Sequence, residues 1–351
     1  MSHPLADDLN HVLDRTRELW EELRGKHLFI TGGTGFFGKW LLESFVWANK
    51  RLALQAEVHV LTRDPSRFGH DVPHLVAEPC IRLVPGNVRA FEFPAGEFSH
   101  VIHAAAESST KREDHDDLSM FHTVVLGTSR VLEFAQQCGA RKLLFTSSGA
   151  VYGRQPSELS HVGEDHAGGP RLTDPHAPYG EAKRAAEQLC CLHAQGGLEC
   201  KIARCFAFVG PHLPLNAHFA VGNFLGDALA GRPIRIAGDG TPFRSYLYAA
   251  DLAIWLWTIL LRGRNGRPYN VGSDEEISIA DLAMRVAGRF SPQPEVSVAL
   301  KPGSGPPPQY VPDTRRARSE LGLQTWIGLD EALDRTIRFH TRSPTGCPED
   351  P

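Results

Sequence analysis

The sequence predicts an α/β fold, a doubly wound parallel sheet accompanied by a smaller C-terminal α/β lobe. Three observations predict it. Short apolar runs typical of buried strands alternate with longer helical runs as far as about residue 206. A glycine-rich turn, TGGTGFFG at 31–38, joins the first predicted strand to the first helix of this series. Beyond about residue 206 proline and glycine become more frequent and the apolar runs become shorter, which indicates a second lobe.

Strands and helices alternate in the order that right-handed crossovers require. The predicted strands lie at 27–31, at 57–62, within 81–88, and at 99–106, 142–148 and 198–205. The predicted helices lie at 5–23, 38–48, 118–139 and 178–195. A further buried helix is predicted at 252–261, because that strongly apolar run is too short to cross a bilayer. Since each crossover covers a face of the sheet with a helix, we expect the strands to be parallel and buried.

These elements divide the chain into a sheet domain and a second lobe, with a short segment at either end. The predicted parts are an amphipathic helix at 1–25, a sheet domain at 26–206 with a returning segment at about 245–275, a second lobe at 207–244 and 276–342, and a flexible tail at 343–351.

The composition excludes several classes of protein. With 351 residues, 42% of them hydrophobic and 22% charged, the chain can bury a large core. A net charge of −4 gives no basic excess for nucleic-acid binding. No membrane span and no signal peptide are predicted, because no apolar run is long enough and MSHPLADDLN lacks the required pattern. The seven cysteines lack metal-binding spacing, so we expect reduced thiols, a cytoplasmic location and no metal site.

The turn at 31–38 has the strand–turn–helix context of a Rossmann dinucleotide-binding loop. Gly32 allows the tight turn, Gly35 lets a pyrophosphate approach the backbone, and Gly38 lets the helix pack closely on the sheet. The N–H groups and positive dipole end of the helix then face the phosphates. The loop residues expected to contact the cofactor are Gly32, Thr34, Gly35, Phe36, Phe37 and Gly38.

The residues after the second strand bear on the choice between NAD and NADP. An NAD site usually has a carboxylate there, which accepts a hydrogen bond from the ribose 2′-hydroxyl. Here Thr62 and Arg63 take that place, and a guanidinium favours a 2′-phosphate, so the sequence favours NADP. NAD remains possible through Asp64 if the register is shifted by two residues.

A tyrosine and a lysine lie four residues apart at the start of the helix at 178–195. This spacing places Tyr179 and Lys183 on one face of the helix. A nearby ammonium favours the phenolate and lowers the pKa of a tyrosine from its usual value near 10. The lysine can also hold the nicotinamide ribose. Ser148, at the carboxyl end of a neighbouring strand, can hydrogen-bond the substrate oxygen that gains or loses the proton.

Taken together, these motifs resemble the extended short-chain dehydrogenase/reductase family of nucleotide-sugar epimerases, dehydratases and reductases. TGGTGFFG resembles the family's TGxxGxxG, HAAAESS its strand-end alanine motif, and SSGAVYG with YGEAK its catalytic serine, tyrosine and lysine. RCFAFVGP and GDGTPFRSYLYAADLA resemble its sugar-nucleotide segments. The resemblance covers about residues 26–340. It implies an enzyme that binds NADP, or possibly NAD, in the sheet domain and takes a sugar nucleotide as substrate.

The resemblance also assigns roles to residues. It makes Ser148, Tyr179 and Lys183 the catalytic set. It implies substrate contacts from Ser148, Gly149, Asn223 and Arg244, with the arginine on the diphosphate. It implies further cofactor contacts from Thr62, Arg63, Asn87, Val88, Ala104, Ala105, Ala106, Thr146, Tyr179 and Lys183. Relatives commonly dimerise through the helices at 118–139 and 178–195, so a homodimer is expected.

Gly149 and Ala150 narrow the range of reactions that the resemblance implies. Family members that dehydrate sugars at C5–C6 carry Asp–Glu at these two positions, one group to protonate the leaving hydroxyl and the other to remove the C5 proton. Neither glycine nor alanine can move a proton, so a 4,6-dehydratase is disfavoured unless a carboxylate from elsewhere, such as Glu107, fills the space.

Two reactions at C4 then remain. In a C4 epimerase Tyr179 removes the 4-hydroxyl proton while hydride passes to the nicotinamide and later returns to the other face of the sugar. In an NADPH-dependent reductase of a 4-keto-6-deoxy sugar nucleotide the same tyrosine is the acid. A cofactor-sensing protein without catalysis is a third hypothesis, disfavoured because Ser148, Tyr179 and Lys183 are intact.

Overall fold

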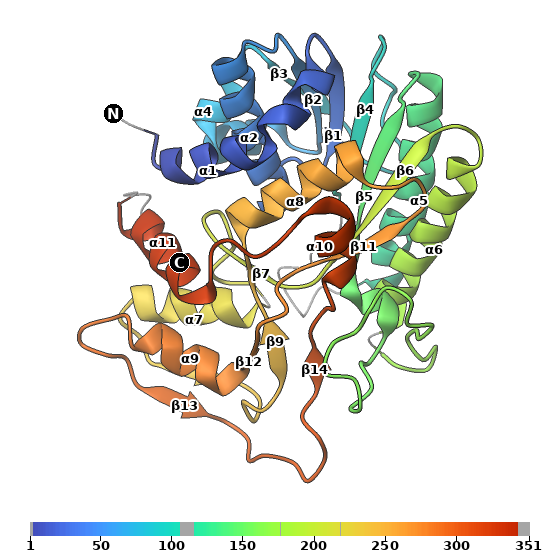
Figure 1. Cartoon of the computed structure of the whole chain (residues 1–351). Helices are drawn as coiled ribbons and strands as arrows, with labels where there is room; N and C mark the ends of the chain where they lie inside the picture. Colours follow the sequence, from blue (N-terminus) through green and yellow to red (C-terminus); the bar gives the residue numbers. More distant parts are fainter. Residues whose placement is uncertain (1–2, 106–115, 176, 218, 343–351) are drawn as a thin grey trace.

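The computed structural model describes residues 3–105, 116–175, 177–217 and 219–342 (Figure 1). The strands of its largest sheet are β1 (His27–Thr31), β2 (Glu57–Thr62), β3 (Ile81–Pro85), β4 (His100–His103), β5 (Lys142–Ser148), β6 (Glu199–Cys205) and β11 (Pro268–Val271). Within the described residues they pair in the order β11-β6-β5-β4-β1-β2-β3, and all neighbours are parallel. The order reverses between β1 and β4, which is where open α/β sheets bind their ligands. The predicted doubly wound fold is confirmed.

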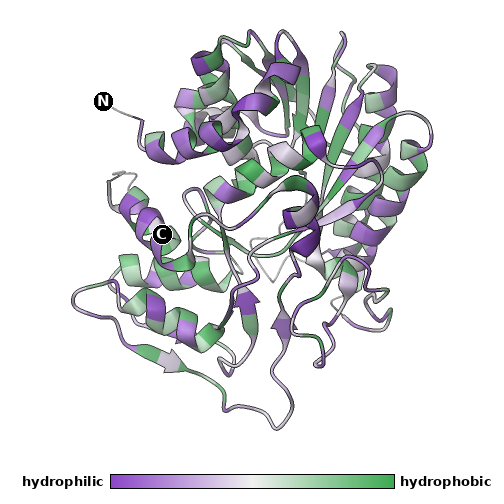
Figure 2. Ribbon diagram, viewed as in Figure 1, coloured by the Kyte–Doolittle hydropathy of each residue, from purple (hydrophilic) through white to green (hydrophobic). Residues whose placement is uncertain are grey.

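Helices cover both faces of this sheet (Figure 1). α2 (Phe36–Leu52) and α8 (Ala249–Arg262) pack on one face with α1 (Ala6–Thr16) against them, and α5 (Asp117–Gln137) and α6 (Ala177–Ala194) pack together on the other. Alternation along β1 explains this: Leu28 and Ile30 join the core under α2 and α8, whereas Phe29 joins the core under α5 and α6. Figure 2 shows hydrophobic and hydrophilic residues alternating along the outer helix α6, as expected of a helix with one buried face.

Several predicted elements occupy the residues expected, and others differ at their ends. β1, β2 and β5 have the predicted bounds. α2 extends from Phe36 to Leu52, and a left-handed residue, Ala53, ends it at φ 48°. The amphipathic segment before β1 is two helices rather than one, α1 followed by the 3-10 helix η1 (Arg17–Leu23). At the junction Thr16 donates from Oγ1 to the Val12 carbonyl at 2.6 Å and accepts from Trp20 Nε1 at 2.8 Å.

The remaining elements of the sheet domain are short. They are α3 (Pro65–Asp71), α4 (Pro73–Val76) and the 3-10 helix η2 (Gly149–Tyr152). α3 and α4 each begin with a proline, which removes an N–H that has no partner in a first helical turn.

The second lobe is built from short strands and helices. Its strands are β7 (Phe208–Val209), β8 (Ile234–Ile236), β9 (Phe243–Ser245), β10 (Leu247–Tyr248), β12 (Glu276–Ser278), β13 (Val296–Val298) and β14 (Gln309–Tyr310). Its helices are α7 (Ala220–Leu229), α9 (Ile279–Ala287), α10 (Arg315–Leu321) and α11 (Leu329–Arg342). Between β10 and β12 the chain returns to the large sheet as α8 and β11. The exact bounds of the two lobes stay a prediction, and the tail at 343–351 lies outside the described residues.

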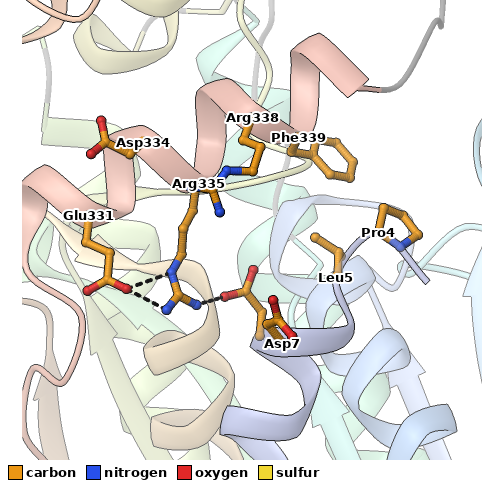
Figure 3. Close-up of a pocket in the computed structure, with 9 residues that line it drawn as sticks. Pro4, Leu5, Asp7, Glu331, Asp334, Arg335, Arg338 and Phe339 are labelled. Atoms are coloured by element: carbon orange, nitrogen blue, oxygen red, sulfur yellow. Dashed lines mark hydrogen bonds and ion pairs between the residues drawn. The ribbon is translucent and has the colours of Figure 1, made fainter. Parts of the chain in front are cut away.

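A charged contact joins α1 to α11. Arg335 pairs with Asp8 on α1 and with Glu331 on its own helix, and Asp8 also accepts from the Tyr248 hydroxyl at 2.7 Å. Figure 3 shows Arg335 directed at Glu331, beside a cavity of about 210 Å³ between the two helices. This contact fastens the first helix of the chain to the second lobe. No helix among the described residues has both the length and the apolarity needed to cross a membrane.

Candidate active site

The glycine-rich turn closes tightly on the strand beside it. Gly32 has φ +71°, and a Cβ there would lie 2.4 Å from the carbonyl oxygen of Ala104. A Cβ at Gly38 would lie 2.3 Å from the carbonyl oxygen of Gly32. At Gly35 a Cβ would meet only that same carbonyl oxygen, at 3.5 Å, so the turn is open on this side. Gly35 precedes the first turn of α2, which has no side-chain cap from any described residue. The uncapped N–H groups and the open glycine together fit the phosphates of a dinucleotide.

The other residues of the predicted loop are accessible or face the second lobe. Thr34, Phe36 and Phe37 are half-buried. The Phe37 ring packs edge-on against Phe208 of β7, with 5.0 Å between ring centroids. The loop is therefore held between the sheet domain and the second lobe.

A buried histidine relay supports the ends of β1 and β4. Nδ1 of His103 lies 2.7 Å from Thr31 Oγ1, and its Nε2 lies 3.0 Å from Thr128 Oγ1 on α5. Thr128 donates its hydroxyl hydrogen to the Val124 carbonyl at 2.6 Å, so it must accept from Nε2–H of the histidine. Burial lowers the pKa of His103 to about 3, so the ring is neutral. Thr31 also accepts from the Ala105 N–H at 3.2 Å, which fixes the backbone that follows β4. Sequence reasoning missed this relay, because its members lie on three separate elements.

The end of β2 presents Thr62 and then Arg63, as the sequence predicts. Thr62 is buried, pairs with Pro85 of β3, and ends the strand, while Arg63 is exposed. Asp64 is the N-cap of α3, where its carboxylate accepts from the Arg67 N–H at 2.9 Å. The carboxylate that would favour NAD therefore serves as a helix cap.

The remaining predicted cofactor residues follow β3 and β4. Val88 is buried against α5, where a Cβ added at Gly127 would lie 3.0 Å from its side chain, and Asn87 beside it is exposed. Ala104 and Ala105 are half-buried directly after β4. The other two predicted groups here, Ala106 and the alternative carboxylate Glu107, lie outside the described residues.

The structure brings the three predicted catalytic residues together at the carboxyl end of β5. The Tyr179 hydroxyl lies close to the side chain of Ser148, whose Oγ accepts from the Ala150 N–H at 3.1 Å. Lys183 lies one turn along α6 from Tyr179, with its Nζ 5.8 Å from the centroid of that ring. The ammonium donates to the carbonyl of Thr146 at 2.8 Å. The predicted cofactor residue Thr146 therefore anchors Lys183.

The pKa of the tyrosine shifts in the direction opposite to the one expected. Burial raises the pKa of Tyr179 above its usual range, and the nearby Ser148 side chain opposes only part of that rise. Burial also lowers the pKa of Lys183 to about 8. The expectation that the ammonium lowers the tyrosine pKa is thus wrong for the protein alone, because desolvation of the phenolate outweighs the distant positive charge.

A second tyrosine that sequence reasoning missed reaches the same serine. The Tyr310 hydroxyl, on β14 of the second lobe, lies close to the side chain of Ser148 and to the backbone of Gly149. Burial raises the pKa of Tyr310 to about 12. No signal in the sequence marks this residue, which lies in a proline- and glycine-rich segment far from the catalytic motif.

The space beside Gly149 is filled by aromatic groups rather than by an acid–base pair. A Cβ at Gly149 would lie 2.8 Å from the Tyr310 hydroxyl oxygen and 2.7 Å from Phe206. The rings of these two neighbours pack with 4.7 Å between centroids. No carboxylate side chain fits at position 149 without moving them.

Two of the four residues predicted to bind the sugar nucleotide, Arg244 and Asn223, belong to the second lobe. Arg244 on β9 is the register partner of Tyr310, and its guanidinium carbon lies 5.5 Å from that ring's centroid. It is half-buried and donates to the Phe243 carbonyl at 2.8 Å. Asn223 is half-buried on α7. Tyr310 thus lies between Arg244 and Ser148, and the substrate-binding roles of Arg244 and Asn223 both stay predictions.

A buried ion pair holds the catalytic helix against the sheet. Glu187 on α6 accepts from Ser147 Oγ at 2.5 Å and from Arg204 Nη2 of β6 at 2.7 Å. Arg204 Nη1 donates to the Tyr152 hydroxyl at 2.9 Å, which donates to Asn270 of β11 at 2.7 Å. These bonds join α6 to β5, β6 and β11, so they fix the position of Tyr179. Sequence reasoning missed them too.

The architecture and these motifs agree with a known family. The model of the NAD dependent epimerase/dehydratase family matches residues 28–272, from β1 to just beyond β11. The chain belongs to that family. Its members similar to this chain include UDP-glucuronic acid decarboxylase 1 of Danio rerio, 29% identical over 318 residues, covering 90% of this chain and 73% of the relative. UDP-glucuronic acid decarboxylase 6 of Arabidopsis thaliana is 29% identical over 310 residues, covering 87% and 86%.

Solved structures of the epimerase/dehydratase family have the same fold. DesIV, a dTDP-glucose 4,6-dehydratase from Streptomyces venezuelae with NAD and TYD bound, gives a TM-score of 0.75 at 24% identity, covering 90% of this chain and 97% of the other. The UDP-glucose 4-epimerase of Thermotoga maritima with UDP-glucose gives 0.72 at 20% identity, covering 90% and 99%. The protein is therefore an enzyme of a family that contains NAD-dependent decarboxylases, epimerases and dehydratases of nucleotide sugars.

Proposed function

We propose that the protein is a nucleotide-sugar epimerase that oxidises and re-reduces a sugar at C4. The observation that carries the proposal is the shared Ser148 hydroxyl. It lies between the phenols of Tyr179 and Tyr310, next to a position 149 that has no acid or base. Such a site can move one proton at one sugar oxygen. Among the described residues, it shows no second proton-transfer pair of the kind that elimination across C5–C6 requires.

A nicotinamide dinucleotide fits the turn at 31–38, because the N-terminus of α2 is uncapped and the glycines leave the backbone open. When bound, it supplies a hydride acceptor and, in its oxidised form, a positive charge that favours a nearby phenolate. Tyr179 then takes the 4-hydroxyl proton in the oxidising direction and returns it in the reducing direction. Ser148 holds the same oxygen of the sugar, and Lys183 is placed to hold the ribose. Arg244 supplies a guanidinium for the diphosphate.

The chain's own residues favour NADP over NAD. Arg63 follows β2 at the place where a 2′-phosphate would lie, and the nearby carboxylate of Asp64 caps α3. Arg63→Ala is expected to weaken NADP binding by about tenfold or more, as loss of a charge-assisted hydrogen bond implies, with little change for NAD. Titration of both cofactors by nicotinamide fluorescence or calorimetry measures this. Equal losses for NAD and NADP would reject the 2′-phosphate role.

The reaction is tested with sugar nucleotides that carry deuterium at C4. An epimerase returns the same hydride to the opposite face, so the C4 epimer keeps the label and no cofactor is consumed. UDP-, dTDP-, CDP- and GDP-hexoses and UDP-glucuronate are incubated with the protein and the products are identified by NMR and mass spectrometry. Products that lose water would overturn the proposal. So would release of CO₂ from UDP-glucuronate, the substrate that the names of the curated relatives suggest.

A 4-ketoreductase is the second candidate, and a specific observation favours it. Burial raises the pKa of Tyr179, so the phenol keeps its proton at neutral pH, which is the form that a reductase uses as an acid. Stoichiometric loss of NADPH on addition of a 4-keto-6-deoxy sugar nucleotide would identify this reaction. The protein as purified would then lack tightly bound oxidised cofactor, which an epimerase retains.

We further propose that the protein is a homodimer through α5 and α6. Leu118 and Leu126 on α5 and Leu192 on α6 are exposed by 64%, 51% and 52%. Several large exposed apolar side chains on two neighbouring helices are consistent with a surface that another subunit covers. Leu126→Glu is expected to give a monomer in sedimentation velocity, whereas Leu300→Glu, which changes an exposed leucine of the second lobe, is not.

We also propose a cytoplasmic location. It is supported by the described cysteines, all of which are thiols.

A further inference from the structure

Three histidines from distant parts of the chain converge on one buried glutamate. Glu43 lies on α2 with only 3% of its side chain exposed. Its carboxylate is 3.3 Å from His3 Nε2, before α1, and 2.7 Å from His74 Nε2 on α4. His212 Nε2, after β7, is 3.6 Å from the same carboxylate. The four residues belong to four segments, and Figure 1 shows α1, α2 and α4 grouped at one edge of the sheet domain.

The cluster holds a carboxylate that no described arginine or lysine pairs with directly. Its nearest nitrogen partners among the described residues are the imidazoles of His3, His74 and His212. Lys39, one turn earlier on α2, adds a positive charge nearby, and burial lowers its pKa. A buried carboxylate whose charged or ring-nitrogen contacts among the described residues are all imidazoles is an unusual arrangement, because buried anions are ordinarily paired with a strong cation.

One nitrogen of the cluster lacks a hydrogen-bond partner among the described residues. Nε2 of His212 is buried, and 3.6 Å to Glu43 is too long for a hydrogen bond. His212 has φ +69°, an uncommon backbone conformation for a residue other than glycine. Trp40 and Phe339 flank its ring, with centroids at 6.5 and 5.2 Å. A strained residue thus holds an unpartnered nitrogen beside an anion, a combination that points to a ligand.

We propose that His3, Glu43, His74 and His212 bind one divalent transition-metal ion of the zinc class. Imidazole nitrogens with one carboxylate are a donor set typical of Zn²⁺. In a tetrahedral site with bonds of about 2.0–2.1 Å, neighbouring donor atoms lie about 3.3 Å apart. The donor atoms of His3, Glu43 and His74 all lie within 4.8 Å of one another, so small side-chain shifts bring them to that spacing. The sequence predicted no metal site, because these four residues show no recognisable spacing.

The four ligands are not equivalent. His3 Nδ1 accepts from the Leu5 N–H at 3.2 Å, so its Nε2 carries the proton. Ligation through Nε2 moves that proton to Nδ1 and breaks the bond from Leu5. His74 and Glu43 need no such exchange with the backbone. We therefore expect His3 to contribute less to metal affinity than His74.

The ion would have a structural role rather than a catalytic one. All four positions around it are taken by protein groups, which is the arrangement of structural zinc sites. It joins the segment before α1, α2, α4 and the segment after β7, and so fastens the start of the chain and the second lobe to the sheet domain. This inference does not depend on the proposed reaction.

The test is zinc binding by the full chain. The protein is dialysed against a chelator and titrated with Zn²⁺ in a calorimeter, and metal in freshly purified protein is measured by mass spectrometry. We expect one equivalent to bind and the melting temperature to rise. Even outer-shell partners contribute about 10–100-fold to metal affinity, so Glu43→Gln and His74→Ala should each weaken binding by more than about 100-fold. His3→Ala should cost less.

Matched controls separate this site from surface binding. His70 on α3 is an exposed histidine outside the cluster, and His70→Ala should bind Zn²⁺ as the unchanged protein does. Glu43 is buried, so Glu43→Gln could disturb the fold. His74 is 47% exposed, so His74→Ala should leave the fold intact and keeps the test valid in that case. Failure of the unchanged protein to bind one Zn²⁺ would overturn the proposal. Full affinity in His74→Ala, or an equal loss in His70→Ala, would overturn it as well. The visible spectrum of bound Co²⁺ gives a second readout, because its bands differ between tetrahedral and octahedral sites.

Discussion

Two tyrosines from different regions of the molecule meet at the hydroxyl of Ser148. Tyr179 comes from α6 of the sheet domain, and Lys183 lies one turn beyond it. Tyr310 comes from β14 of the second lobe, and Arg244 lies over its ring. Both phenols lie close to the same serine, but the sheet-domain phenol lies beside the predicted nicotinamide site and the other closes the space beside Gly149. Because the two side chains are of the same chemical type, we assign the proposed proton-transfer role to Tyr179 on the basis of its position beside the predicted nicotinamide site.

The largest expected effect is at Tyr179. Tyr179→Phe removes the proton carrier and should lower kcat by about 100- to 10,000-fold, the usual contribution of general acid–base catalysis. Product formation from the best sugar nucleotide measures kcat, and cofactor titration should be unchanged. If turnover stays within a few fold of normal, the proton passes through another group, and Tyr310 becomes the first candidate.

Gly149→Ala should disturb the packing of Tyr310, the tyrosine of the second lobe, beside Ser148. The added methyl would meet Phe206 and the Tyr310 hydroxyl at 2.7 and 2.8 Å, which forces these side chains apart. Overpacking of this kind costs about 1–3 kcal/mol of stability. Thermal or denaturant unfolding measures the loss. Gly303→Ala is the control, because no atom lies within 4 Å of a Cβ there, and an equal loss in both variants would contradict the packing argument.

The pH dependence of the reaction should follow the ionisation of Lys183, which belongs to the sheet domain. Burial lowers the pKa of Lys183 to about 8 from an ordinary value of 10.5. The ammonium is therefore present below about pH 8 and is lost above it, so kcat/KM should fall as the pH rises through 8. The same shift means that this residue costs stability at low pH, and that the cost diminishes between pH 8 and 10.5, where only the unfolded chain holds the proton.

The variant Lys183→Arg tests whether the fall of kcat/KM above pH 8 is caused by loss of the Lys183 proton. Arginine keeps its charge at these pH values, so a folded variant should lose the decline near pH 8 even if its kcat is lower. A decline at the same pH in the arginine variant would show that another group titrates there.

The smallest effect is expected at Tyr310. Tyr310→Phe keeps the ring against Phe206 and Arg244 and removes only the hydroxyl. Loss of one neutral hydrogen bond costs about 0.5–1.5 kcal/mol, or roughly 2- to 12-fold in kcat/KM. Comparison of kcat/KM for this variant and for Tyr179→Phe is the direct measurement. Similar losses in the two would mean that both phenols transfer protons.

Local patterns in the sequence predicted the sheet domain well. β1, β2 and β5 were found at the predicted residues because each is a short apolar run bounded by polar or turn residues. The catalytic set was predicted because its members occur in contiguous motifs. What binds them in place was not predicted: the His103 relay and the Arg204–Glu187 pair join side chains from separate strands and helices. Such contacts depend on tertiary packing, which no local pattern encodes.

The same limit explains the incorrect pKa expectation. The four-residue spacing places Tyr179 and Lys183 on one face of a helix, but it says nothing of how deeply that face is buried. Desolvation of the phenol is a property of the assembled site, and it reverses the sign of the shift. Tyr310 was missed for a related reason, since the strand that carries it has only two residues and no strand pattern.

The return of the chain to the large sheet as α8 and β11 limits how the protein can be divided. α8 is buried from its first residue to Leu261 and covers the sheet beside β5 and β6, and β11 pairs with the outer edge of β6. A fragment ending at residue 206 would leave an unpaired strand edge and a bare apolar face. Expression of the sheet domain alone should therefore yield aggregates, and a proteolytic cut within the second lobe should leave two pieces that stay associated until denatured.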